Sequence, residues 1–131
     1  MLRKKFIKDP IFGGNFWFCI GSKDEFADFV YKKDGYEVNR DVEVDGKMVK
    51  IIGGRQFIWI QNKDISVLIH EIVHMVNNNM DRVAIPLSVD TDEVYAFYTQ
   101  FLFKECNKFL NEKPKLQKTI RKNLGEKKTR R

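Results

Sequence analysis

The segment 65–78 constrains the fold of this chain more than any other part of it. Its apolar residues recur at helical spacing, which predicts an amphipathic helix. The apolar stripe consists of Ile65, Leu68, Ile69, Ile72 and Val76, with Val73 beside it. Val67 and Met75 leave little of the circumference polar, so we expect the helix to be largely buried. A residue in 62–64 can cap its amino end, and 77–79 are expected to end it.

Both histidines of the chain lie in this helix, in the sequence His70-Glu71-Ile72-Val73-His74. Residues i and i+4 share one helix face, so both imidazoles can bind one metal ion at about 2 Å. Glu71 lies at the edge of that face, where it can act as general base toward a water on the metal. Two core histidines with their own hydrogen-bond partners are the alternative. Burying three titratable groups without an ion is costly, so we predict metal ligation.

A catalytic zinc site needs a third protein ligand, and a carboxylate beyond the motif is the expected source. Glu93 is our choice, because it lies inside a second helix predicted at about 92–112. Ala96, about one turn further on, would permit close packing of the two helices. Asp92 is the alternative ligand, and stabilisation of the helix dipole is the alternative role for Glu93. With two histidines and a carboxylate, Zn²⁺ is the default metal.

The rest of the chain predicts an α+β fold. The other expected elements are a helix at 22–34, one or two short strands in 6–20, a hairpin in 41–52 and a well-covered strand at 56–60. Ser22 and Glu25 form a capping box, Asp45-Gly46 is a hairpin turn signal, and Thr91 can cap the last long helix. We expect a small, mostly antiparallel sheet of three or four strands packed against the three helices.

The charge is divided unevenly along the 131 residues. Segment 113–131 carries nine Lys/Arg and one acid, whereas 1–112 carries 15 basic and 17 acidic side chains, a net charge of −2. This division predicts one domain at 1–112 followed by a basic C-terminal tail at 113–131. The tail could contact nucleic acid through phosphates, an acidic protein surface or anionic lipid, and a solvated tail is the simpler interpretation.

The location of the chain is expected to be cytoplasmic. No apolar run approaches the length of a membrane span, and the charged N-terminus has no hydrophobic region behind it, so no membrane association is expected. Cys19 and Cys106 lie among apolar residues, and we expect both to be buried free thiols.

A strand, an HExxH helix, a loop and a second helix with a Glu together resemble the zincin superfamily of metallopeptidases in its Glu-ligand form. The stretch EVYAFYTQFLF at 93–103 is similar to the second-helix signature of the ImmA/IrrE metallopeptidases. Ile85-Pro86 and the helix start at 92–97 are similar to small HExxH proteins of phages and prophages. The resemblance covers about 55–110.

This resemblance implies a zincin-like fold in which His70, His74 and Glu93 are the metal ligands and Glu71 is the base. It also implies the host cytoplasm as location if a phage encodes the chain. Phe97 stands where thermolysin-like enzymes carry an Asp that holds a ligand His. The oxyanion-stabilising residue is open, with Tyr95, Tyr98 and Arg82 as candidates.

Two functions follow as hypotheses. The first is a zinc-dependent metallopeptidase that hydrolyses a peptide bond in a protein or peptide substrate, which would bind along an edge strand. The second is a catalytically inactive zincin-fold binding or regulatory protein of phage or prophage origin. The two differ in whether a bound metal keeps an open position for water.

Overall fold

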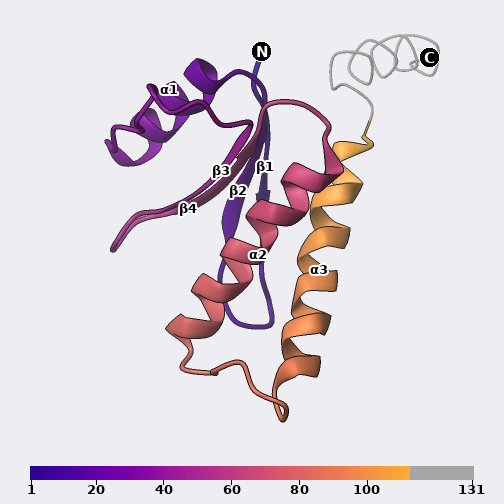
Figure 1. Cartoon of the computed structure of the whole chain (residues 1–131). Helices are drawn as coiled ribbons and strands as arrows, with labels where there is room; N and C mark the ends of the chain where they lie inside the picture. The colour runs from indigo at the N-terminus through magenta and orange to yellow at the C-terminus, as the bar shows by residue number, and fades with distance from the viewer. Residues whose placement is uncertain (113–131) are drawn as a thin grey trace, which may run out of the picture.

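Residues 1–112 are described in this computed structural model, and the predictions made for the tail at 113–131 lie outside the described residues. The elements are β1 (Arg3–Ile7), β2 (Phe16–Ile20), α1 (Lys23–Asp34), β3 (Gly46–Lys50), β4 (Gln56–Ile60), α2 (Ile65–Arg82) and α3 (Asp92–Leu110). The predicted α+β class is confirmed. Figure 1 shows α2 and α3 side by side over one face of the sheet, with α1 packed on the other.

The sheet is mixed, with strand order β1-β2-β4-β3. β1 pairs antiparallel with β2, and β3 pairs antiparallel with β4. The two hairpins join through parallel pairing of β2 with β4, which places β1 and β3 at the edges. Parallel neighbours need a crossover connection, and α1 lies within it.

The two central strands send alternate side chains to opposite helical layers. Phe18 and Ile58 pack in the cluster with α2 and α3, whereas Cys19 and Trp59 pack with α1. Because both faces are covered, these strands read as continuous apolar runs rather than as alternating ones. Cys19 and Cys106 are both buried and free, as predicted. Burial raises the pKa of the Cys19 thiol to about 12.

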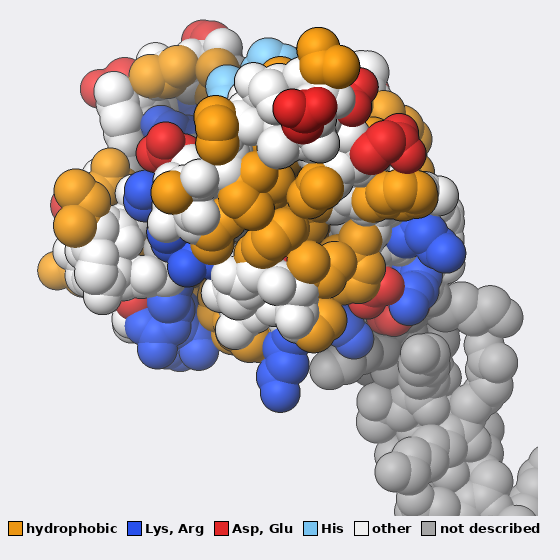
Figure 2. All heavy atoms as spheres, turned by 90° about the horizontal axis from the view of Figure 1, so that it is seen from below, with side chains coloured by type: hydrophobic (Ala, Val, Ile, Leu, Met, Phe, Trp, Pro, Cys, Tyr) orange, Lys and Arg blue, Asp and Glu red, His pale blue; other side chains and the backbone are white. Residues whose placement is uncertain are grey.

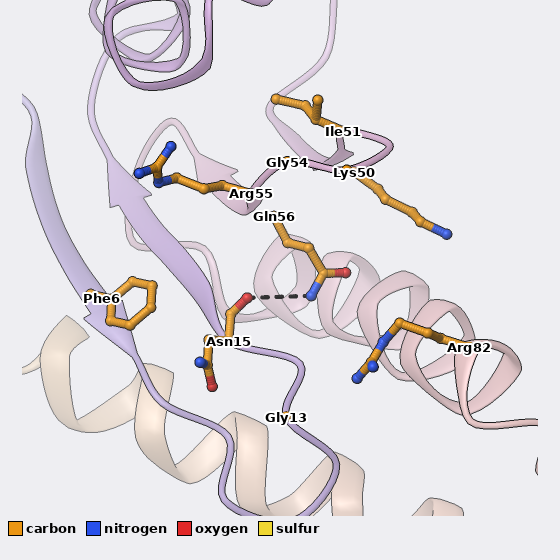
Figure 3. Close-up of a pocket in the computed structure, with 10 residues that line it drawn as sticks. Phe6, Gly13, Asn15, Lys50, Ile51, Gly54, Arg55, Gln56 and Arg82 are labelled. Atoms are coloured by element: carbon orange, nitrogen blue, oxygen red, sulfur yellow. Dashed lines mark hydrogen bonds between the residues drawn. The ribbon is translucent and has the colours of Figure 1, made fainter.

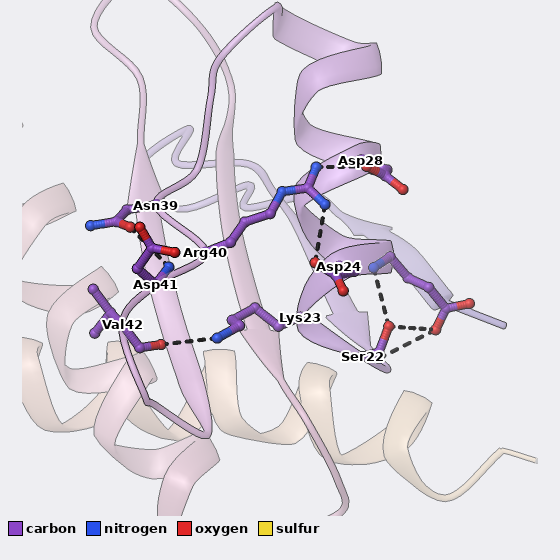
Figure 4. A network of polar contacts seen from close by, with 9 residues as sticks. Ser22, Lys23, Asp24, Asp28, Asn39, Arg40, Asp41 and Val42 are labelled. Atoms are coloured by element: carbon purple, nitrogen blue, oxygen red, sulfur yellow. Dashed lines mark hydrogen bonds and ion pairs between the residues drawn. The ribbon is translucent and has the colours of Figure 1, made fainter.

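The capping box of α1 is confirmed, since Ser22 accepts from the Glu25 amide and the Glu25 carboxylate accepts from Ser22. The following loop is held against this helix by polar contacts (Figure 4). Arg40 pairs with Asp24 and Asp28 at 3.1 and 2.6 Å. Lys23 donates to the carbonyl of Val42 at 3.2 Å. These contacts fix the segment that leads into β3.

The hairpin predicted around Asp45-Gly46 is wrong in its position. The turn lies between β3 and β4 instead, where Gly53 has φ +73° and the Ile51 carbonyl accepts from the Gly54 amide. Gly46 begins β3 where that strand passes close to α2, and a Cβ there would lie 2.5 Å from Val67 Cγ1. A glycine that lets a strand approach a helix closely cannot be distinguished in the sequence from a glycine in a turn, which explains the wrong prediction.

The ends and the burial of the long helices differ from the prediction. Asp64 caps α2 as expected, but the helix continues through the asparagines to Arg82 because Asn79 lies in the core. The outer face of α2 is also more open than predicted, since Ile69 and Val73 are each 45% exposed. Thr91 makes no cap hydrogen bond, because its hydroxyl oxygen instead accepts from the Ser88 amide at 2.8 Å while the hydroxyl donates to the Pro86 carbonyl.

A buried polar cluster joins the β1–β2 loop to both long helices. The Asp9 carboxylate accepts from three backbone amides of its own loop and from the Tyr98 hydroxyl at 2.5 Å. That hydroxyl accepts in turn from Asn79 Nδ2 at 2.8 Å. Burial raises the pKa of Asp9, but the four hydrogen bonds together outweigh it, so the pKa lies below its usual value.

Candidate functional site

The two histidines lie on the exposed face of α2, one turn apart. Asp64 starts the helix by accepting from the Ser66 amide at 2.9 Å, so the motif lies within regular helix. His70 Nε2 and His74 Nε2 are 3.3 Å apart, and the rings cross at 74°. The histidines are visible as a pale blue pair at the surface in Figure 2. Both imidazoles are therefore exposed, contrary to the prediction that all three titratable groups of the motif are buried.

The separation of the two nitrogens suits a shared metal ion. Zinc–nitrogen bonds of about 2.0–2.1 Å at a tetrahedral angle place two ligand nitrogens about 3.3–3.4 Å apart. The distance of 3.3 Å between the two Nε2 atoms matches that value without side-chain rearrangement. A hydrogen bond from one imidazole to the other gives the same contact, depending on the tautomers.

Glu71 differs from the histidines in being buried, with 6% of its surface exposed. It faces β3, where a Cβ on Gly46 would lie 3.3 Å from Glu71 Cγ. Burial raises the pKa of Glu71, against the opposing effects of both histidines, the Met48 amide and Lys47. A desolvated carboxylate beside two imidazoles is suited to accept a proton from a water between them.

A cavity of about 420 Å³ opens beside this carboxylate, between the start of β3 and the first turns of α2. Its lining residues are Glu43, Val44, Asp45, Gly46, Ser66, Val67, His70 and Glu71. The segment 43–46 was not predicted to belong to the site, because its contact with α2 is long-range and its Asp-Gly pair favours a turn. Residues 43–45 precede β3, which begins at Gly46, so their alternation of apolar and acidic residues marks no strand and gave no signal of this contact.

Glu93 is not brought to the histidines in this structure. It is exposed at the start of α3. The helices run antiparallel and meet where Asn79 contacts Tyr98. His74 precedes Asn79 and Glu93 precedes Tyr98, so the two lie on opposite sides of this contact. Because α2 continues to Arg82, the chain has moved well away from the histidines before α3 begins.

The alternative ligand Asp92 lies still nearer the amino end of α3 and is exposed as well. Within residues 1–112, no three side chains of His, Cys, Asp or Glu gather closely enough to hold a metal ion. In this arrangement of the helices, the structure therefore brings together two candidate ligands, His70 and His74, without a third among these residues.

The three candidates for oxyanion stabilisation have other partners. Tyr98 is buried against Asp9, and the Tyr95 hydroxyl donates to the Ile85 carbonyl at 2.6 Å. Arg82 donates to the carbonyl of Phe12 at 2.6 Å. Each of these side chains holds a loop in place, which is a structural role.

Comparison of the chain with models of protein families, with curated proteins and with solved structures finds no match in any of the three. Over the described part of the chain, none of the helices has the length and apolar character needed to cross a bilayer.

Proposed function

We propose that the chain is a zinc-dependent metallopeptidase, with His70 and His74 as metal ligands and Glu71 as general base. The observation that carries the proposal is the 3.3 Å separation of the two Nε2 atoms, which suits zinc, next to a buried carboxylate. A bound zinc ion would polarise a substrate carbonyl and lower the pKa of water toward 7. Glu71 would accept the proton of the attacking water and pass it to the leaving amine.

The position of β3 supports a peptide as the substrate. β3 is an edge strand beside Glu71, and it is bonded to β4 on one side only. An extended peptide can add to such an edge through backbone hydrogen bonds. Its carbonyl groups would then lie over the outer face of α2, where the histidines are exposed.

Glu93 remains the predicted third ligand, and this role requires α3 to move relative to α2 when metal binds. Glu93→Gln tests the prediction through the zinc affinity of the purified chain. A loss of about tenfold or more would support ligation. An unchanged affinity would remove Glu93 from the metal site and leave water to complete the coordination.

The central experiment combines zinc analysis with a peptide-cleavage screen. We expect about one zinc ion per wild-type chain. Glu71→Gln should retain the zinc and lower cleavage by about 10²–10⁴-fold, because it removes the general base. Glu37→Gln is the matched control, since Glu37 is exposed on the loop after α1. A wild-type chain that folds but takes up no zinc after reconstitution would overturn the proposal.

The second candidate, a binding protein without catalysis, is favoured by an exposed apolar surface. The end of the α2–α3 loop and the start of α3 expose Leu87, Val89, Val94 and Phe97. Figure 2 shows hydrophobic side chains gathered on this lower face of the molecule. Contiguous exposed apolar area often marks an interaction site. Under this hypothesis Glu71→Gln would leave function unchanged, whereas Phe97→Ser would weaken partner binding.

A further inference from the structure

The cavity beside Glu71 has an acidic wall. Two of its lining residues, Glu43 and Asp45, are exposed carboxylates, and Lys and Arg are missing from its lining. Among residues 1–112, neither carboxylate forms an ion pair with a basic side chain. Glu71, which is 6% exposed, adds a third carboxylate at the inner end. Lys47 acts on Glu71 from β3 but does not line the cavity, and the three carboxylates outnumber it, so the cavity is suited to a cationic group.

The segment that carries the two carboxylates is anchored at both ends. Arg40 and Val42 are held against α1 by ion pairs and a hydrogen bond (Figure 4). At the other end, the Asp45 carbonyl accepts from the Gln61 amide at 2.8 Å. The carboxylates are thus placed by the fold, and a ligand would meet them without ordering a free loop.

The cavity also offers an apolar surface for a long side chain. Val44 and Val67 line it together with Gly46, whose missing side chain leaves the approach to Glu71 open. Lysine and arginine pack their aliphatic stems on such surfaces while the charged head reaches polar groups. The volume of about 420 Å³ is ample for either side chain.

The opposite end of β3 has the opposite charge. A second cavity, of about 410 Å³, is lined by Lys50, Arg55 and Arg82 together with amide and glycine residues and the apolar Phe6 and Ile51 (Figure 3). Arg55 is already paired with Asp34. A peptide that lies along β3 would therefore meet negative charge near Glu71 and positive charge toward Lys50.

We propose that the cavity formed by 43–46 and α2 selects a lysine or arginine side chain of the substrate, next to the bond that is cleaved. This inference rests on the proposed peptidase function and adds the substrate class to it. A peptide on the edge of β3 would place one side chain into the cavity while its neighbouring carbonyl lies beside His70 and Glu71.

The test is cleavage of a quenched fluorescent peptide library by the zinc-loaded full-length chain. Peptides with Lys or Arg beside the cut bond should be cleaved with a kcat/KM about tenfold above their Leu or Glu counterparts, the scale of two partly exposed ion pairs. The preference should weaken as salt is raised. It should disappear in the double variant Glu43→Gln/Asp45→Asn, which should cleave the Lys and Leu peptides with similar kcat/KM.

The double variant Glu37→Gln/Asp90→Asn is the control, because it changes net charge equally at two exposed acids outside the cavity. Cleavage without preference for basic residues, or a preference that survives loss of Glu43 and Asp45, would overturn the proposal. Loss of zinc from the cavity variant would also overturn it, because the carboxylates would then be metal ligands.

A lack of any cleavage would reject the proposed function. The preference of the cavity for basic side chains would then be tested by peptide binding. Fluorescence anisotropy with a labelled Lys peptide and its norleucine analogue then decides. Tighter binding of the Lys peptide, lost in the cavity variant, would support the acidic cavity as a site for basic side chains. Equal binding of the two peptides would overturn it.

Discussion

The molecule has two polar clusters on α2 that are built in opposite ways. The histidine pair is exposed, and its members lie one turn apart on a single helix. The cluster of Asp9, Asn79 and Tyr98 is buried, and its members come from a loop and two helices. Helical spacing alone places the first cluster, whereas only the complete tertiary fold can place the second.

Because of this difference, the two clusters should affect different properties of the protein. An exposed pair contributes little to the free energy of unfolding, because its groups keep much of their hydration when unpaired. A buried carboxylate with four donors cannot lose them without leaving polar groups unsatisfied in the core. We therefore expect substitutions in the buried cluster to affect stability and those in the exposed pair to affect metal binding.

The largest stability effect is expected for Asp9→Asn. The amide retains one acceptor oxygen but turns an NH₂ group toward donors that now lack an acceptor. We expect the free energy of unfolding to fall by about 3 kcal/mol, measured by urea denaturation. Zinc content of the folded variant should match wild type. A variant as stable as wild type would show that the cluster does not support the fold.

The same carboxylate predicts a pH dependence. The pKa of Asp9 is lower in the folded state than its ordinary value of 3.8, so the unfolded chain binds its proton more tightly. The contribution of the Asp9 carboxylate to the free energy of unfolding is complete above about pH 5. It is lost as the pH falls through the folded-state pKa. The stability difference between wild type and Asp9→Asn should narrow from pH 5 downward. A constant difference across this range would contradict the assignment.

Gly14→Ala is expected to have an intermediate effect. A Cβ at this position would lie 2.2 Å from Asn79 Nδ2, inside the buried cluster. Relief requires movement of Asn79 or of the loop, at a cost of about 2 kcal/mol. Gly13→Ala is a less direct control, because its Cβ would meet open space but its φ of +72° adds backbone strain. Thermal denaturation of both variants separates the clash from the strain.

The smallest stability effect is expected for His74→Ala in metal-free protein. The side chain is exposed, and we expect a change within about 0.5 kcal/mol. Elemental analysis should show complete loss of zinc from the same variant. A large loss of stability without metal would mean that the two imidazoles serve the fold through their mutual hydrogen bond.

The sequence predicts local structure better than contacts between distant segments. Ser22 with Glu25 and Asp64 are capping signals that need only their neighbours, and both are confirmed. The predicted end of α2 at 77–79 is too early. Asparagine often ends a helix, but Asn79 remains helical because its side chain donates to Tyr98 in the core. Thr91 does not cap α3 for a similar reason, since the loop before it supplies a competing donor, the Ser88 amide.

The same distinction between local and long-range contacts applies to the candidate site. The relation of His70 to His74 follows from helix geometry and could be predicted from five residues. The approach of 43–46 to α2 depends on the length and position of the β3–β4 turn, which the Asp45-Gly46 signal obscured. The place of Glu93 depends on how far α2 extends beyond the motif, and helix ends are poorly specified by local sequence.

The parallel pairing of β2 with β4 has a consequence for how the chain folds. Each antiparallel hairpin joins strands that are close in sequence, but Trp17 opposes Phe57 across the centre of the sheet. Closing so long a loop costs entropy before any central contact forms. We expect docking of the two hairpins around α1 to limit the folding rate. During synthesis, the inner edge of β2 therefore has no pairing partner until β4 has been made.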